Sequence, residues 1–509
     1  MLLLVLLVVL ILLIVRRRKI QKFINLSKQI KCEIRSYPLI GHAYLLTGGS
    51  VNFMNTFQMF AREAIRNGGM TNLWIGSKYY IVAVDAADIE IVLKSSLEKD
   101  NVVRFVRNFI GNGPIFAPVS IWRPRRKVTA PTFSLKNLNR FVKIFARQSA
   151  NLVQALKAVE GNGAQPVWNY MTTYTLDSVC ETVFGVKMNS HENQEEPILK
   201  AFEIVSSLIA ERMLQPWLQT DSVYKLLSCH YRFEKNKKVL HDFVKKVITL
   251  TRERLKENCE TDESSTNRAK CFLELLIEAS GGERGYSDVE LLEEGLVMLI
   301  AGTDTSASGM SFTVSMMANN PDVQDKVFQE LHEVFGDSDR PVVPEDLPHL
   351  KYLDAVIRES MRLYPPVPII VREIHADTQL PSGITVTKEC AIIINIWGVH
   401  RNPAYWGDDA EEFRPERFLE ETGRHSVAYL AFSNGPRNCL GTQYSMMSMK
   451  TALATLFRNY RVLSPEDNMK QSAGVTNREP LKVKFEVMMK DVDGFRVKLV
   501  KRKNHIKRT

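Results

Sequence analysis

The sequence has few cysteines for its length and no C-x-x-C pair. Seven cysteines are scattered between Cys32 and Cys439 in a chain of 509 residues. A chain that faces the cytosol keeps its thiols reduced, so we expect no disulfide framework. The odd number makes at least one cysteine a candidate for a chemical role.

The chain also lacks a proline- or glycine-rich linker and any internal repeat. Its residues are 45% hydrophobic and 24% charged, which is typical of a globular protein with a large core. Length alone suggests about three domains, but this is a weak guide. We expect one large domain over residues 38–509, preceded by a connector over residues 20–37.

Acidic residues are missing from the two places where the net charge of +10 is concentrated. One basic patch is Arg16–Lys19, and the other covers residues 501–508. The remainder is nearly neutral, so we expect no nucleic-acid-binding face. The basic ends are either solvated tails or are attracted to anionic lipid headgroups, by about 1 kcal/mol per basic residue. The neighbouring apolar segment favours lipid.

A long apolar run occurs at Met1–Val15, directly before the first basic patch. Signal peptides place positive charge before the apolar run and small residues after it, and here the order is reversed. The positive-inside rule then places residue 16 onward in the cytosol. We expect an uncleaved signal anchor with a basic stop over residues 1–19, and a cleaved signal peptide is the alternative.

Most of the remaining chain has apolar residues at helical spacing. The longest predicted helix runs from Ser287 to about Asn319, opens with a Ser287/Glu290 capping box and stops before Asn320-Pro321. Further helices are expected at Pro321–Phe335 and Leu350–Leu363. Strand-like runs occur at Tyr79–Val84, Ile384–Val386 and Ala391–Ile396, the last too apolar for a surface strand. The fold class is therefore mainly helical (α+β), with a minor sheet.

The strongest local motif is the ten-residue segment from Phe432 to Gly441, F-S-N-G-P-R-N-C-L-G. Gly435 and Gly441 permit a tight loop around the sulfur of Cys439. An amphipathic helix is expected from Leu440, so its N-terminus favours a thiolate, which is the form that binds metal. The plain alternative is a buried cysteine beside a turn.

A second motif, Ala301-Gly302-Thr303-Asp304-Thr305-Ser306, lies inside the longest predicted helix. Thr305 is placed to hydrogen-bond the carbonyl of Ala301 and open the helix locally, and Gly302 removes bulk there. Asp304 offers a proton source beside this opening. The alternative is a stretch of small residues where helices pack closely.

Both motifs resemble those of the cytochrome P-450 family, F-x-x-G-x-R-x-C-x-G and [AG]-G-x-[DE]-T, and the resemblance covers nearly the whole chain. Within the family the sequence is most similar to the microsomal family-four-like clan. The resemblance implies the cytochrome P-450 fold, a haem b cofactor ligated through Cys439, and Gly302, Asp304 and Thr305 as the oxygen-activating residues. Phe432, Arg437 and Gly441 belong to the implied haem loop.

The family also has an E-x-x-R motif followed by a P-E-R-F-like segment, and both occur here. Glu359 and Arg362 share one face of a predicted helix, and Arg417 follows in Phe413–Phe418. Exposed pairs of this kind are usually of little consequence. We interpret the three residues as a structural network around the cysteine loop, without a catalytic role.

Further residues are expected to bind the haem propionates. Trp122 and Arg126 are four apart, so on a helix their indole N–H and guanidinium project together. This requires Pro124 in the first helical turn, with Ser120 as the cap. The alternative is a basic surface helix that includes Arg123, Arg125 and Lys127. Arg372 matches another propionate-binding position of the family.

One position departs from the clan. Many members have a glutamate before the helix glycine that is ester-linked to the haem, whereas this chain has Ala301. We therefore expect non-covalent haem, and selectivity for terminal carbons is not carried over.

The resemblance implies a monooxygenase in the endoplasmic reticulum membrane, with its catalytic domain facing the cytosol. It implies electrons from an NADPH-dependent flavin reductase, O2, and a lipophilic substrate: a fatty acid, hormone, odorant or xenobiotic. The alternatives are a haem-thiolate isomerase or hydroperoxide-rearranging enzyme, and a non-catalytic haem- or lipid-binding membrane protein. Proton delivery by Asp304 and Thr305 argues for the monooxygenase.

Overall fold

The computed structural model describes residues 20–100, 104–188, 197–260, 270–421, 423–466 and 480–502. The predicted anchor over residues 1–19 and positions 503–508 of the C-terminal basic patch lie outside these ranges. No helix within the described ranges is both long and apolar enough to span a membrane. The chain divides into two compact units, each formed by separate segments.

The first unit has its described residues within Met1–Asn101, Pro368–Glu411 and Arg424–Asn438. Its helices are α2 (Gly49–Arg66), α3 (Ala86–Ser95), α15 (Ile396–Val399) and α16 (Pro403–Trp406), with 3-10 turns η1 (Ala43–Leu46) and η8 (Ser426–Ala428). Its strands are β1 (Met70–Ile75), β2 (Lys78–Ala83), β4 (Ile369–Glu373), β5 (Thr378–Gln379), β6 (Thr385–Val386) and β7 (Ala391–Asn395).

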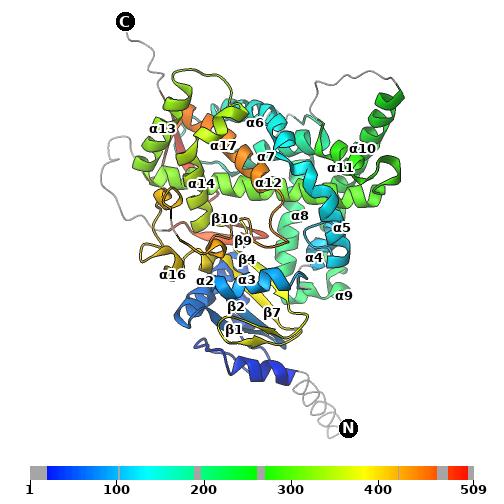
Figure 1. Ribbon diagram of the computed structural model, residues 1–509, viewed down its shortest axis with the longest axis vertical. Coiled ribbons are helices and arrows are strands. Elements are labelled where there is room, and N and C mark those ends of the chain that lie inside the picture. The colour runs from blue at the N-terminus through cyan, green and yellow to red at the C-terminus, as the bar shows by residue number, and fades with distance from the viewer. Residues whose placement is uncertain are drawn as a thin grey trace. The chain divides into compact units, whose positions relative to one another are not determined.

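A four-stranded sheet in the order β1-β2-β7-β4 organises this unit (Figure 1). Strands β2 and β7 are parallel, with Tyr80 opposite Ala391, and the other neighbours are antiparallel. Phe57 and Phe60 of α2 form a core with sheet residues such as Ile393. All five residues of β7 are buried, which confirms that the Ala391–Ile396 run is an interior strand.

The second unit has its described residues within Val102–Val367, Glu412–Gly423 and Cys439–Thr509. Its helices are α4 (Arg104–Ile110), α5 (Val119–Thr129), α6 (Leu135–Leu156), α7 (Trp168–Phe184), α8 (Pro197–Leu214), α9 (Asp221–Tyr224), α10 (Ser228–Glu260), α11 (Phe272–Ser280), α12 (Asp288–Asn319), α13 (Pro321–Phe335), α14 (Lys351–Leu363) and α17 (Thr442–Asn459). Its 3-10 turns are η3 (Ala130–Phe133), η4 (Pro216–Gln219), η5 (Gly282–Arg284), η6 (Pro344–His349) and η7 (Pro415–Phe418). Its strands are β3 (Gln165–Pro166), β8 (Tyr460–Leu463), β9 (Val483–Glu486), β10 (Met488–Asp491) and β11 (Arg496–Lys501), which form one sheet in the order β3-β11-β8 and a β9–β10 hairpin.

The long helix α12 runs through this unit, in contact with α7, α14 and α17 (Figure 1). Its predicted capping box is present, since the Ser287 hydroxyl accepts from the Glu290 N–H and the Glu290 carboxylate accepts from the Ser287 N–H. The box thus provides acceptors for two backbone N–H groups at the start of the helix. The predicted bounds of α12 and of α13 are confirmed, and α14 begins one residue later than expected.

Helix α5 begins earlier than the sequence argument required. Pro118 is its N-cap, and the Pro118 carbonyl accepts from Ile121 N–H at 3.0 Å and Trp122 N–H at 2.8 Å. Ser120 is therefore not the cap and Pro124 is not in the first turn, so both predictions were wrong. Pro124 lies inside the helix, where its missing N–H leaves the Ser120 carbonyl without a helical bond from it. Trp122 and Arg126 are still four apart on one helix.

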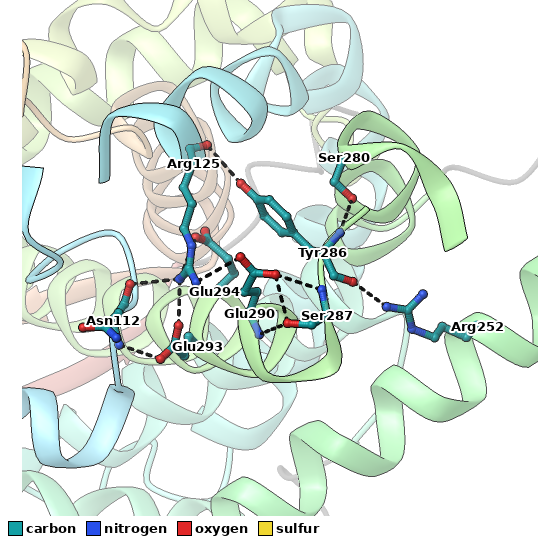
Figure 2. A network of polar contacts seen from close by, with 9 residues as sticks. All are labelled: Asn112, Arg125, Arg252, Ser280, Tyr286, Ser287, Glu290, Glu293 and Glu294. Carbon is teal, nitrogen blue, oxygen red and sulfur yellow. Dashed lines mark hydrogen bonds and ion pairs between the residues drawn. The ribbon is translucent and has the colours of Figure 1, made fainter. Parts of the chain in front are cut away.

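Arg125 is buried among carboxylates, so the alternative that placed it on a basic surface is wrong (Figure 2). Its Nη1 atom is 2.8 Å from Glu293 Oε2 and donates to the Asn112 carbonyl at 2.9 Å. Nη1 is also 3.9 Å from Glu294 Oε1, and Nη2 is 3.4 Å from Glu290 Oε1. Because the three glutamates belong to α12, this network fixes α5, with Trp122 and Arg126, against α12.

Glu294 has the most unfavourable position in this network. The residue is fully buried, and neither carboxylate oxygen has a hydrogen-bond partner among the described residues. Burial raises the pKa of Glu294 to about 7, against the opposing influence of Arg125. The carboxyl group is therefore close to half-protonated at neutral pH.

The predicted network of Glu359, Arg362 and Arg417 is present and buried. Arg362 Nε is 2.6 Å from Glu359 Oε2, and Arg417 Nε is 3.1 Å from Glu359 Oε1. Glu359 Oε1 also accepts from the Arg414 N–H at 2.8 Å, and Arg362 donates to the Glu412 carbonyl at 2.9 Å. One carboxylate thus ties α14 to residues 412–417, which include the start of η7.

Glu359→Gln should destabilise the protein by about 3–5 kcal/mol, because it leaves two guanidinium groups buried without their counter-charge. The measurement is the free energy of unfolding from urea titrations of the two proteins. Glu278→Gln is the matched control, since Glu278 forms an exposed ion pair with Lys270 at 2.7 Å. We expect it to cost less than about 1 kcal/mol. Equal losses in both variants would contradict a central role for Glu359.

Glu294→Gln should stabilise the protein more at pH 8 than at pH 5. The folded-state pKa of about 7 lies above the ordinary value of 4.5, so the wild type loses stability as pH rises between these values. Glutamine does not ionise, so the variant does not lose this stability as pH rises. The measurement is the difference in Tm between variant and wild type at each pH.

Glu293→Gln on the same helix is the control for this experiment. It breaks the 2.8 Å ion pair with Arg125 and should lower Tm. A Glu294→Gln effect that is the same at pH 5 and pH 8 would show that Glu294 titrates as an ordinary glutamate.

Candidate functional site

The loop before Cys439 is held close to α3 in the first unit. Gly435 has φ of +75°, and a Cβ atom there would lie 2.9 Å from the carbonyl oxygen of Leu93. Asn438 N–H donates to the Gly435 carbonyl at 3.0 Å, which closes a tight turn. Both the left-handed backbone and the close approach require glycine at this position. Phe432, the first residue of the motif, is half-buried.

Cys439 begins the last segment of the second unit and precedes α17, which starts at Thr442 with Gly441 as N-cap. The side chain keeps an exposed surface, although protein atoms crowd around its sulfur. This desolvation raises the pKa of Cys439, and the Gly441 N–H, Thr442 and Arg126 act in the opposite direction. The sequence predicted that the start of the helix favours the thiolate of Cys439. In the protein without a bound metal, this effect on the pKa is weaker than the opposing effect of burial. Coordination to a metal deprotonates a thiol outright.

Trp122 and Arg126 accompany Cys439 in the second unit. Trp122 is buried and Arg126 is half-buried. Burial lowers the pKa of Arg126, whereas the charge on Cys439 raises it. The structure thus brings the predicted iron ligand and one predicted propionate-binding arginine within electrostatic reach of each other.

The first unit contains a buried group of cations. Arg372, on β4, is 2% exposed, and burial together with Arg437 lowers its pKa to about 10. Lys99 joins them, and burial, Arg372 and Arg437 place its pKa well below the ordinary value. The Nε of Arg372 has no hydrogen-bond partner among the described residues. Three largely desolvated cations that act on one another at short range fit an anionic group such as the haem propionates.

Lys99 was not identified from the sequence. It stands between Glu98 and Asp100, and a charged tripeptide of this kind is typical of a solvated surface. Lys99 differs from a surface lysine only because Arg372 and Arg437, which are far away in the sequence, lie near it in the structure.

The Ala301–Ser306 motif in α12, for which we expect a role in oxygen activation, has the predicted internal hydrogen bond. Thr305 Oγ1 donates to the Ala301 carbonyl at 2.6 Å. Thr305 is half-buried, whereas Thr303 and Asp304 are buried. Asp304 Oδ1 lies 3.4 Å from Lys490 Nζ, and burial raises the pKa of Asp304 although Lys490 lowers it. The motif therefore places the carboxyl group of Asp304 next in sequence to the hydroxyl of Thr305, which donates to a backbone carbonyl of the same helix.

Gly302 has a packing explanation. A Cβ atom at this position would lie 2.7 Å from Cγ2 of Val179, on α7. The space that the glycine leaves is taken by this neighbouring helix, as the plain interpretation of the motif expects. A role for Gly302 in binding a small ligand stays a prediction.

The comparison with known proteins agrees with the geometry. The model of the family described as Cytochrome P450 matches residues 33–485. Cytochrome P450 4V2 of Mus musculus is 34% identical over 489 residues, covering 93% of this chain and 90% of its own length. Cytochrome P450 4d2 of Drosophila melanogaster is 31% identical and covers 84% of this chain and 88% of its own length.

The expectations on fold class, cofactor and reaction class are thereby confirmed at this level. The mainly helical architecture with a minor sheet agrees with the family fold. The chain therefore belongs to the cytochrome P450 family and is a haem-thiolate monooxygenase, an oxidoreductase that binds a non-covalent haem b and takes O2, a hydrophobic substrate and electrons from a redox partner.

Proposed function

We propose that Cys439 is the ligand of the haem iron in this chain. Its thiolate is supported by the Gly441 N–H, Thr442 and Arg126. When bound, the haem supplies the activation of O2 and the transfer of one oxygen atom to the substrate. Phe432 and Gly441 belong to the same loop motif.

We propose that Trp122, Arg126, Arg372 and Arg437 bind the haem propionates, and we add Lys99 to this group. The support is electrostatic: burial lowers the pKa of Lys99, Arg126 and Arg372, and a bound anion would favour their charged forms. Glu359, Arg362 and Arg417 act as scaffold, because their charges are satisfied by one another and by backbone groups.

The proposed function is hydroxylation of a lipophilic molecule with O2, and the Asp304–Thr305 pair is the observation that carries it. O2 consumption with insertion of one oxygen atom requires two protons, and the second atom leaves as water. A buried carboxyl group next to a hydroxyl suits proton delivery at this place. Ala301 contributes the carbonyl that holds Thr305.

The alternatives make less use of this pair. A haem-thiolate isomerase or hydroperoxide-rearranging enzyme starts from a substrate that already holds the oxygen, so it needs no protons for O2. A non-catalytic haem- or lipid-binding protein needs neither residue. NADPH consumption with a reductase and a lipophilic substrate distinguishes these functions.

We propose that the electrons come from NADPH through a flavin reductase. Arg123 and Lys127 are exposed on α5, the helix that also has Arg126. An exposed basic helix suits an acidic redox partner, whose approach it would accelerate.

We propose an endoplasmic reticulum membrane location, with the catalytic domain in the cytosol, through the anchor at Met1–Val15. Exposed apolar side chains support contact with lipid in each unit. In the second unit Trp217 is 60% exposed, Leu226 87% and Tyr231 73%, and in the first unit Leu39 is 62% exposed. Exposed apolar groups of this size gather where a protein meets a membrane or a partner.

The substrate class that we propose is a fatty acid, hormone, odorant or xenobiotic, and fatty acids are tested first. The experiment is a titration of the purified holoprotein with medium- and long-chain fatty acids, hydrophobic esters and terpenoids, followed by the Soret band. A substrate that displaces water from the haem shifts the band towards the high-spin form. We expect a saturable shift with fatty acids, whereas a shift only with the smaller volatiles would favour odorant or xenobiotic clearance.

Thr305→Ala should uncouple NADPH use from product formation. Product formed per NADPH should fall at least about tenfold, because positioned proton transfer typically contributes 10²–10⁴-fold. NADPH oxidation, product and hydrogen peroxide are measured together, with the ligand that gives the Soret shift. Thr303→Ala is the matched control, since Thr303 is buried on the same turn and does not bond to Ala301. Unchanged coupling in Thr305→Ala would refute the assigned role.

A further inference from the structure

We propose that Lys490 is the positioning residue of Asp304 and controls the supply of protons from solvent to the oxygen-activation motif. The inference rests on the proposed role of Asp304 and Thr305 and extends it to the β9–β10 hairpin. Lys490 is 186 residues from Asp304 in the sequence and belongs to none of the motifs discussed above.

The contact is between two buried or nearly buried charges. Lys490 Nζ lies 3.4 Å from Asp304 Oδ1, with the two side chains 14% and 2% exposed. Nζ also lies 4.5 Å from the centre of the Trp168 ring, which adds a cation–π contact. Lys490 is therefore confined between an acid and an aromatic face.

The hairpin itself is fixed to α12, so the approach of Lys490 is determined by the fold. The hydroxyl of Ser308, one helical turn after Asp304, donates to the Met489 carbonyl at 2.8 Å. The Met489 N–H donates in turn to the Pro366 carbonyl at 2.8 Å. Both backbone groups of the residue before Lys490 are thus bonded within the second unit.

Other acidic groups connect this pair towards solvent. Glu486, at the end of β9, lies 3.9 Å from Lys490 Nζ, and its side chain is 30% exposed. Glu203, on α8, interacts electrostatically with both Lys490 and Asp304, and burial raises its pKa. The charged groups facing Asp304 thus come from α8, β9 and β10.

Exposure of the side chains increases from Asp304 through Lys490 to Glu486. Two protons and two electrons are taken up for each O2, and one oxygen atom leaves as water. Both protons come from solvent, and in our scheme Asp304 receives each one in the hairpin cluster and passes it towards Thr305. Lys490 and Asp304 have the same charges at the end of a turnover as at its start.

Without Lys490, no other cation of the described residues is paired with Asp304 to oppose the effect of burial on its carboxyl group. The acid would then stay protonated or turn away from its present position. Either change in Asp304 would alter the proton-transfer step. If the contact with Lys490 were only structural, its loss would leave that step unchanged.

The test uses full-length holoprotein reconstituted with an NADPH-dependent flavin reductase and no added substrate, so that two electrons from NADPH and two protons convert each O2 to hydrogen peroxide. NADPH oxidation, O2 consumption and hydrogen peroxide are measured in H2O and in D2O. Lys490→Met should slow NADPH oxidation about tenfold and change its solvent isotope effect, because proton delivery becomes limiting. Lys490→Arg should restore both to within about twofold, since it keeps the positive charge.

Lys482→Met is the matched control. Lys482 is exposed and directly precedes β9 of the same hairpin. This variant removes the same charge next to the hairpin, and we expect no change in the isotope effect. Tm of each variant is measured in parallel, and Lys490→Gln replaces Lys490→Met if the methionine variant fails to fold.

Asp304→Asn separates failure of this inference from failure of the proposed function. If Asp304→Asn leaves the isotope effect unchanged, the role proposed for Asp304 is overturned and the inference with it. If Asp304→Asn changes the isotope effect and Lys490→Met does not, only the inference is overturned. A lower Tm in Lys490→Met with an unchanged isotope effect would likewise reduce Lys490 to a structural residue.

Discussion

A charge inside this protein is stable only where an opposite charge or a hydrogen bond replaces the water that folding removes. Glu359 shows the favourable case, because it meets Arg362, Arg417 and the Arg414 N–H at once. Burial acts against the charged form of Cys439, Arg372 and Lys99, and it shifts the pKa of each in that direction. The first arrangement builds a scaffold, and for the second we have proposed the haem iron and its propionates as the opposite charges.

The sequence predicted the elements whose signals are local. The Ser287/Glu290 capping box and the prolines at 321 and 365 mark helix ends through bonds and clashes within a few residues. The bounds of α12, the start of α13 and the end of α14 followed from them. The bond from Thr305 to Ala301 is equally local. Glu359 and Arg362 share a helix face, and only the meeting with Arg417 needed the resemblance to the family.

The features that were missed depend on neighbours distant in the chain. Arg125 resembles any residue of a basic helix until three glutamates of α12 surround it. Lys99 and Lys490 are ordinary lysines in sequence, and the charged groups that act on them include residues far away in the chain. The start of α5 was wrong because the Pro118 carbonyl, and no polar side chain, begins the helix.

The close approach of Gly302 to Val179 joins two positions into one unit of evolutionary change. A Cβ atom at position 302 would lie 2.7 Å from Cγ2 of Val179, so the Val179 side chain would have to shift or be replaced by a smaller one. Substitutions at positions 302 and 179 are therefore expected to be non-additive in their effect on stability. The coupling limits which single substitutions the surroundings of Thr305 accept without loss of stability.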